Sequence, residues 1–214
     1  MKRVGITGGI GSGKSFVCRL LQAKGYPVYD CDTEAKRLMV THPDIIRDMR
    51  ALLSDAVYEP LLQEGAPVHT DDAGPLAEVA PAYRLNKQLV ADYLFASGDH
   101  ATHINAIVHP RVKEDFLRWA ERQNTELVFV ESAILKEAHF LDVLDAVLLV
   151  SAPDKVRLRR AMTRDRATEP QIRLRMSQQQ SQASMRKFAS FEIVNDGKND
   201  LSASLDSFLQ TLIA

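Results

Sequence analysis

The sequence has few cysteines, almost no net charge and no long apolar run. Its 214 residues include two cysteines, Cys18 and Cys31, whose spacing matches neither a metal-binding nor a redox motif. The longest uninterrupted apolar run, residues 146–150, is far too short to cross a bilayer. A formal net charge of −1 argues against a dedicated nucleic-acid or membrane-surface binder. We therefore expect a protein of a reducing, cytoplasmic compartment with no nucleic-acid or membrane partner.

A phosphate-binding motif is present near the amino end. Residues 8–15 read Gly-Gly-Ile-Gly-Ser-Gly-Lys-Ser and match the pattern G-x-x-x-x-G-K-[ST], between a predicted strand and a helix predicted over residues 14–24. Glycines let backbone N–H groups converge on an anion, and the helix N-terminus adds a positive dipole end. Lys14 suits the β- and γ-phosphates of ATP, and the Ser15 hydroxyl suits Mg²⁺. A turn that is merely rich in glycine is the alternative interpretation. The nucleotide-binding residues predicted here are Gly9, Gly11, Ser12, Gly13, Lys14, Ser15 and Phe16.

Strand-like runs recur with helical stretches between them and predict an α/β fold. Continuous apolar runs of this kind are typical of a parallel sheet that is covered on both faces. We expect a doubly wound five-stranded parallel sheet, in a single P-loop kinase unit with a nucleotide-binding core over residues 1–35 and 120–214. A helical lid is expected over residues 160–187. The predicted strands cover residues 2–7, 27–29, 127–130, 146–151 and 191–194.

Residues 36–119 interrupt this alternation. The segment has no convincing strand, shows helical periodicity over residues 85–94 and 104–119, and holds a connection rich in glycine, proline and aspartate at residues 64–75. We expect a mostly helical insertion that binds the acceptor substrate, with plain surface helices as the alternative. His109 precedes a proline, which disfavours helix there and predicts a fixed turn.

Two aspartates follow the second predicted strand. Asp30 and Asp32 stand where α/β folds place their ligands, and a spacing of two puts both carboxylates on one side of an extended chain. Such a carboxylate can orient an acceptor hydroxyl or take its proton, so both residues are candidates for acceptor binding. The alternative role for Asp32 is to cap the next helix.

A basic segment over residues 155–175 contains the candidate lid arginines. Arg157, Arg160 and Arg164 have i, i+3, i+7 spacing and share a helix face. Phosphoryl transfer needs guanidinium groups that reach the γ-phosphate as a lid closes. We predict that Arg160 and Arg164 do so, whereas solvated helix charge is the alternative for the others.

Several motifs together resemble the dephospho-coenzyme A kinase family. They follow one another over nearly the whole chain: Gly5–Ser15, Val28–Asp32 (Val-Tyr-Asp-Cys-Asp), Ile104–Val112 (with His109-Pro110), Arg160 with Arg164-Asp165, and Ile193–Gly197 (Ile-Val-Asn-Asp-Gly). The resemblance implies ATP- and Mg²⁺-dependent phosphorylation of the ribose 3′-hydroxyl of dephospho-coenzyme A, the last step of coenzyme A synthesis.

The resemblance also implies roles for single residues. Asp32 corresponds to the family's catalytic acid/base, and His109 to a residue of the substrate pocket. Lys87 stands where the family often has an arginine, and Glu131 is a candidate acid on the magnesium side. Asn195, at the end of the fifth strand, is expected either to line the adenine pocket or to begin a turn. The segment 131–137 departs from the family, since it lacks the usual proline and aromatic residue.

Other P-loop functions leave different traces in a sequence. A guanine-specific GTPase needs Asn-Lys-x-Asp, and residues 86–89 start this way but lack the aspartate. A nucleoside or nucleotide kinase of the same architecture stays open, as does a nucleotide-dependent switch without transfer chemistry. The paired aspartates and lid arginines disfavour a switch. We expect a monomer or small homo-oligomer.

Overall fold

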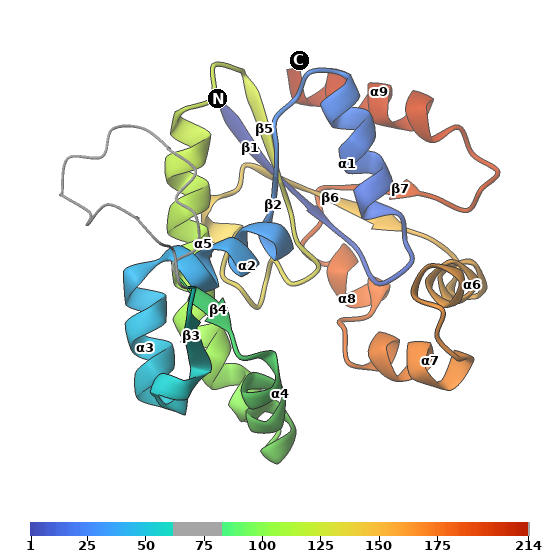
Figure 1. Ribbon diagram of the computed structural model, residues 1–214. Coiled ribbons are helices and arrows are strands. Elements are labelled where there is room, and N and C mark those ends of the chain that lie inside the picture. Colours follow the sequence, from blue (N-terminus) through green and yellow to red (C-terminus); the bar gives the residue numbers. More distant parts are fainter. Residues whose placement is uncertain (62–82, 214) are drawn as a thin grey trace. The chain divides into compact units, whose positions relative to one another are not determined.

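The computed structural model describes residues 1–61 and 83–213, so the whole of the expected connection over residues 64–75 lies outside the described part (Figure 1). The chain forms two compact units. Unit 1 comprises residues 1–31 and 116–214, and unit 2 comprises residues 32–115. These divisions fall a few residues from the expected ones at 36 and 119. No described helix is both long and apolar enough to span a membrane.

Five strands among the described residues build the parallel sheet of unit 1. Their order across the sheet is β2-β5-β1-β6-β7, so β1 lies at the centre. The predicted doubly wound five-stranded α/β core is confirmed, with strand bounds that differ by at most one residue. The strands are β1 (Lys2–Thr7), β2 (Val28–Asp30), β5 (Leu127–Glu131), β6 (Ala146–Ser151) and β7 (Phe191–Val194).

The strand register places the candidate residues of unit 1 at one edge of the sheet. Ile6 and Asp30 both pair with Glu131, so β1, β2 and β5 end together. On the other side, Ser151 pairs with Val194, the last residue of β7. The phosphate loop, Glu131 and Asn195 therefore all follow the carboxyl ends of neighbouring parallel strands, where α/β folds bind ligands.

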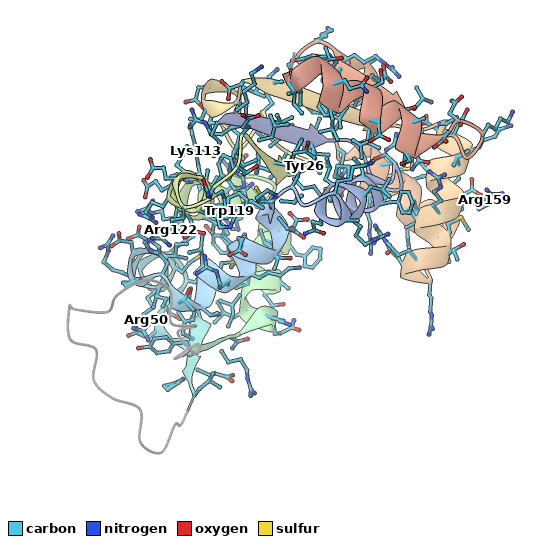
Figure 2. All side chains as sticks on the ribbon, turned by 90° about the horizontal axis from the view of Figure 1, so that it is seen from above. Tyr26, Arg50, Lys113, Trp119, Arg122 and Arg159 are labelled. Carbon is cyan, nitrogen blue, oxygen red and sulfur yellow. The ribbon has the colours of Figure 1, made fainter. Side chains whose placement is uncertain are left out.

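Alternate side chains of the strands form the main core with two helices. These are α1 (Lys14–Ala23) and α9 (Leu201–Ile213), which lie side by side (Figure 1). Lys24, directly after α1, forms an ion pair with Asp206 of α9, with an N–O distance of 2.6 Å. Tyr26 (Figure 2) meets Phe129 edge-on, with ring centroids 5.7 Å apart. The buried members of this cluster include Val4, Ile6, Val17, Leu21, Phe129, Leu148, Val150, Ile193, Leu205, Phe208 and Leu209.

Several alternate strand side chains that do not belong to this cluster are buried as well. Val128, Val130 and Leu149 are fully buried. Because both faces are covered, the strands read as continuous apolar runs, and this is why they were predictable. Aromatic rings also pack together in unit 1. The ring centroid of Phe116 lies 5.4 Å from that of Tyr29 and 5.8 Å from that of Phe140.

Three helices follow β6 in unit 1, where the lid was expected. They are α6 (Asp154–Asp165), α7 (Glu169–Ser177) and α8 (Gln182–Arg186). Arg166 has a φ of 50° and ends α6, and Thr168 with Gln171 forms a capping box that begins α7. Leu158, Ala161 and Ile172 give this helix pair a small core of its own.

Unit 2 is mostly helical but contains a hairpin that the sequence analysis did not predict. β3 pairs antiparallel with β4, with Tyr58 opposite Leu85. Strands of three residues are too short for an alternating pattern to show, and Tyr58 and Tyr83 pack at 5.8 Å. The elements are α2 (Cys31–Thr41), α3 (Pro43–Leu53), η1 (Asp55–Val57), β3 (Tyr58–Pro60), β4 (Tyr83–Leu85), α4 (Lys87–Ala96) and the first part of α5 (His100–Glu121).

The prediction of a turn at His109 is wrong, because α5 continues through Pro110 as one helix. A proline inside a helix removes one backbone hydrogen bond and disfavours the helical conformation of the preceding residue. Ile104, Val108 and Val112 are buried at intervals of four residues. Burial of this apolar stripe outweighs the local preference at the proline.

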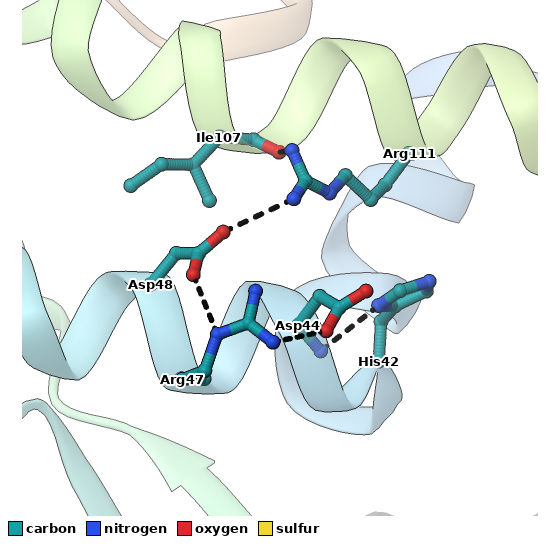
Figure 3. Close-up of polar contacts among 6 residues, drawn as sticks. All are labelled: His42, Asp44, Arg47, Asp48, Ile107 and Arg111. Atoms are coloured by element: carbon teal, nitrogen blue, oxygen red, sulfur yellow. Dashed lines mark hydrogen bonds and ion pairs between the residues drawn. The ribbon is translucent and has the colours of Figure 1, made fainter.

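A polar network connects α3 to α5 inside unit 2 (Figure 3). The Asp48 carboxylate accepts hydrogen bonds from Arg47 at 2.9 Å and from Arg111 at 3.1 Å. Arg47 also donates to Asp44 at 2.6 Å, and His42 accepts from the Asp44 N–H at the start of α3. Arg111, within the family-like segment of α5, therefore has a structural partner in its own unit.

The packing of unit 1 leads to a stability prediction. Leu148 is fully buried in β6 within the main cluster, so Leu148→Ala should lower the free energy of unfolding by about 2–5 kcal/mol. Urea denaturation followed by circular dichroism measures this. Gln210→Ala on the exposed side of α9 is the control and should stay within about 0.5 kcal/mol of wild type. A Leu148→Ala midpoint equal to that of the control would contradict the assigned core.

Candidate active site

The phosphate loop connects the central strand β1 to helix α1. Gly13 immediately precedes α1 with a φ of 102°, a left-handed conformation that favours glycine. A Cβ at this position would also collide with the side-chain amide of Asn195. The motif glycine is thus required both by the backbone conformation and by the approach of a residue from the end of β7.

Carbonyl oxygens of the loop are bound by donors from several elements of unit 1. Lys14 Nζ donates to the Gly8 oxygen at 2.8 Å, and the Ser12 N–H donates to the Gly9 oxygen at 3.1 Å. Asn195 Nδ2 donates to the Ser12 oxygen at 2.9 Å. These bonds hold the carbonyls on the protein side of the loop.

The N–H groups of Gly11 and Gly13 have no hydrogen-bond partner within residues 1–61 and 83–213. The buried Ser12 hydroxyl is likewise without a partner among these residues. Because polar groups in such positions need partners, the loop fits an anionic ligand with several acceptor oxygens. The first turn of α1 adds further N–H groups, which point out of the N-terminus of the helix toward the loop. A phosphate chain offers acceptor oxygens of this kind.

Lys14 and Glu131 form the charged centre of the site. Their side chains are 12% and 14% exposed, and Lys14 Nζ lies 3.8 Å from Glu131 Oε1. Glu131 Oε2 accepts a hydrogen bond from the Cys18 thiol of α1 at 3.6 Å. Burial, and then the charge of Glu131, raise the pKa of the Cys18 thiol well above its ordinary value. The thiol therefore stays protonated and keeps donating to Glu131.

The predicted magnesium ligands, Ser15 and Glu131, offer hard oxygen atoms. Ser15 is exposed in the first turn of α1, and Glu131 ends β5 beside the loop. Mg²⁺ takes one or two protein oxygens and completes its shell with phosphates and water, so this donor set fits. The described residues contain no cluster of three or more His, Cys, Asp or Glu side chains suited to a metal.

The two aspartates after β2 differ from their predicted arrangement. Asp30 ends the strand, but α2 begins at Cys31, so the extended conformation does not continue to Asp32. Asp32 lies instead in the first turn of α2 and is exposed, which agrees with the favourable position of an acid at a helix N-terminus. The spacing argument for a shared side is therefore wrong. The roles of both carboxylates stay predictions.

Arg160 binds the residue that holds the loop. Its guanidinium donates to the backbone oxygen of Asn195 at 2.9 Å and to Asn195 Oδ1 at 3.2 Å. The Asn195 amide nitrogen is then directed to the Ser12 oxygen. Asn195 thus contacts the phosphate loop directly, and the predicted adenine contact is not tested by these bonds.

Arg164 lies at the end of α6 and is much more exposed. Its side chain is 63% exposed and donates two hydrogen bonds to the neighbouring Asp165, at 2.7 and 3.2 Å. These bonds, together with the charges of Arg164 and Arg175, lower the pKa of Asp165. A surface hollow of about 400 Å³ between α6 and α7 is lined by Lys155, Arg159 and Arg173 rather than by the predicted lid arginines.

The predicted acceptor residues Lys87 and His109 belong to unit 2. Lys87 is exposed at the first position of α4, directly after Asn86, whose side chain caps the helix by accepting from the Leu89 N–H at 3.1 Å. His109 is half-buried in α5. The helical location of residues 87–89 agrees with the rejection of a GTPase motif there.

Known proteins match this chain over nearly its whole length. The dephospho-CoA kinase family matches residues 2–66 and 77–200, which include the phosphate loop, Asp32 and Asn195. A dephospho-CoA kinase of Bacteroides fragilis is 41% identical over 200 residues, covering 93% of this chain and 87% of the relative. A solved Thermus thermophilus protein has a TM-score of 0.74 and 28% identity, covering 99% of this chain and 96% of that chain.

The chain belongs to the dephospho-CoA kinase family. The resemblance carried by the motifs is therefore confirmed. A dephospho-CoA kinase structure from Campylobacter jejuni, with a TM-score of 0.63 and 17% identity over 99% of this chain and 98% of that chain, shows the same fold. As a dephospho-CoA kinase family member, the chain combines this fold with the phosphate loop described above.

Two residues of this family member contact the loop although the sequence analysis gave them no role. Arg157 and Gln179 both bind the backbone of Ile10. The helix-face spacing did place Arg157 beside Arg160, but burial cannot be read from spacing. Nothing in the sequence distinguished Gln179 from its neighbouring glutamines.

The environment of Cys18 predicts slow thiol chemistry. Since the thiolate is the reactive form and the pKa is raised, native Cys18 at pH 8.5 should react with a disulfide reagent on the order of 100-fold more slowly than in urea. For the same reason, Cys18 should make the free energy of unfolding fall as the pH rises above its ordinary thiol pKa, because only the unfolded state then releases the proton. A Cys31→Ser variant isolates Cys18, and rapid native reaction in that variant would disprove the assignment.

Proposed function

We propose that this chain transfers the γ-phosphoryl group of ATP to the ribose 3′-hydroxyl of dephospho-CoA, which yields CoA and ADP in the last step of CoA biosynthesis. The observation that carries the proposal is the family match, which extends from the phosphate loop through the insertion to Asn195. The cytoplasmic setting expected from composition is part of the same proposal. The oligomeric state of the protein stays a prediction, namely a monomer or small homo-oligomer.

The donor binds through the main chain of the phosphate loop. The N–H groups of Gly11, Gly13 and the first turn of α1 bind phosphate oxygens, and Lys14 brings its charge to the β- and γ-phosphates. Lys14 is bonded to the Gly8 oxygen, which keeps its ammonium group against the loop before the nucleotide binds. A preorganised cation of this kind stabilises charge without reorganisation at the moment of transfer.

Mg²⁺ belongs to this donor side. Ser15 and Glu131 supply the protein oxygens for it, and the metal neutralises charge on the triphosphate when bound. Glu131 is held in place by the Cys18 thiol and lies beside Lys14. The negative carboxylate next to Lys14 also keeps the local charge balanced before ATP arrives.

The acceptor hydroxyl needs a carboxylate to orient it. In this proposal Asp32 accepts the 3′-hydroxyl proton while the oxygen bonds to the γ-phosphorus. The bond from the γ-phosphorus to the oxygen that bridges the β- and γ-phosphates breaks, and ADP leaves with that oxygen. Asp30 contributes a second carboxylate at the acceptor. Lys87 and His109 bind the rest of dephospho-CoA, whose pyrophosphate suits the Lys87 ammonium.

Arg160 and Arg164 complete the charge stabilisation. Arg164 is exposed and bound to its own neighbour, so it can move to the transferring group when the lid closes. Arg160 lies one turn earlier in α6 and is bonded to Asn195, which in turn donates to the Ser12 oxygen of the loop. Closure also excludes water, which would otherwise hydrolyse ATP.

A panel of acceptors tests the substrate. We expect ADP formation from ATP and Mg²⁺ to be stimulated by dephospho-CoA, with phosphorus NMR showing a new 3′-phosphate. Stronger stimulation by a nucleoside or nucleoside monophosphate would replace the proposal with the second kinase interpretation. Slow ADP formation that no acceptor stimulates would identify a nucleotide-dependent switch.

The role of Asp32 has its own test. Asp32→Asn keeps the shape but cannot take a proton, so kcat should fall by about 10²–10⁴-fold while the Kd for ATP changes by less than about twofold. Glu34→Gln is the matched control, because Glu34 lies in the same first turn of α2 and is bonded to Arg37. Turnover in Asp32→Asn equal to that of the control would refute the general-base role.

A further inference from the structure

Ile10, in the phosphate loop, is bound by residues of the segment 153–186 through its side chain and both of its backbone polar groups. Its side chain packs against the small core of α6 and α7, formed by Leu158, Ala161 and Ile172. This residue belongs to the variable part of the motif, where no side-chain type is required for phosphate binding. The packing makes Ile10 a part of the core of those two helices.

The backbone oxygen of Ile10 is bound by Arg157. Arg157 Nε donates to it at 3.0 Å, and Nη1 of the same side chain bonds to Asp154 at 3.0 Å. Arg157 is only 5% exposed, although its helix has many solvent-exposed cations. Burying a guanidinium is costly unless its donors are used, and here they are directed to the loop and to Asp154. Gly9 leaves room for it, since a Cβ there would collide with the guanidinium.

The N–H group of Ile10 is bound by Gln179. The Gln179 side-chain oxygen accepts this hydrogen bond at 2.8 Å. Gln179 lies in the connection between α7 and α8, which is itself fixed because Gln182 bonds to both the N–H and the oxygen of Ala152, at 2.9 and 3.0 Å. The contact thus reaches the loop from a connection that is anchored at the end of β6.

We propose that Arg157 and Gln179 are positioning residues, which hold the Ile10 peptide groups toward the protein so that the next N–H groups of the loop converge on the phosphates. The inference rests on the proposed phosphoryl transfer, in which the loop binds the donor. Rotation of the peptides next to Ile10 would turn neighbouring N–H groups away from a common point. Binding both polar groups of one residue prevents this rotation.

Two substitutions remove the two bonds separately. Arg157→Met keeps an unbranched side chain without donors, and Gln179→Leu keeps a similar volume without the acceptor. Arg159→Met is the control for the first, because Arg159 is exposed on the outer side of the same helix (Figure 2). Gln178→Leu is the control for the second, at the exposed neighbouring position. Gln179 is half-buried at a helix connection, so its variant tests the proposal even if Arg157→Met does not fold.

The affinities for ADP and for adenosine are compared by displacement of a fluorescent ADP analogue, so that only the donor site is measured. We expect ADP affinity to fall by about tenfold or more in each variant, since each loses one bond that orients the loop, and adenosine affinity to change by less than about twofold. The KM for ATP should rise while the KM for dephospho-CoA stays near wild type. Arg157→Lys, which retains one charged donor nitrogen, should recover part of the ADP affinity.

A simple loss of stability predicts a different result. It would lower ADP and adenosine affinity together, and this outcome would overturn the proposal. A ratio of ADP affinity to adenosine affinity that stays at the wild-type value in both variants would overturn it as well. The binding comparison uses no acceptor. If the wild-type protein does not phosphorylate dephospho-CoA, the proposed function fails while the ratio still tests the positioning role. If it does phosphorylate dephospho-CoA and the ratio is unchanged, only the positioning role fails.

Discussion

The phosphate loop depends on donors that bind its carbonyl oxygens from the protein side. Each peptide carries its N–H and C=O on opposite sides, so N–H groups that converge on a ligand leave carbonyls that need partners elsewhere. In this chain the partners are Lys14, Arg157 and Asn195, from α1, α6 and the end of β7. The motif supplies the glycines, and the parallel sheet of unit 1 brings the donors to them. The loop conformation is thus a property of the whole unit.

The charges around the loop are arranged to keep Lys14 available. Glu131 balances the Lys14 ammonium, and the neutral Cys18 thiol occupies the other carboxylate oxygen. A cationic partner in place of Cys18 would compete with Lys14 for Glu131, whereas an apolar one would remove a hydrogen bond to the Glu131 carboxylate. A protonated thiol avoids both effects. Cys18, which matches no metal-binding or redox motif in the sequence, thereby supports the charged centre.

The sequence was sufficient to predict the sheet and the loop, because both are encoded locally. Buried parallel strands read as apolar runs, and the motif needs only eight adjacent residues. Three other features were not predicted or were predicted wrongly. α5 continues through Pro110 because of its buried stripe, the hairpin of unit 2 pairs strands of three residues, and α2 begins at Cys31 before the extended chain can reach Asp32. For α5, burial of the apolar stripe outweighed the local preference at the proline.

The arginines of α6 show how one helix face can serve different purposes. Their i, i+3, i+7 spacing suggested a shared role, but their partners differ: Ile10 and Asp154 for Arg157, Asn195 for Arg160, and the neighbouring Asp165 for Arg164. Side-chain exposure is 6% for Arg157 and 63% for Arg164. An exposed ion pair contributes only about 0–1 kcal/mol, so Arg164 can exchange its partner for a phosphate at little cost. Arg157 is buried, and moving it would break its bond to the Ile10 oxygen. The buried arginine of α6 therefore bonds to the loop, and the exposed arginine is the one proposed to move to the transferring group.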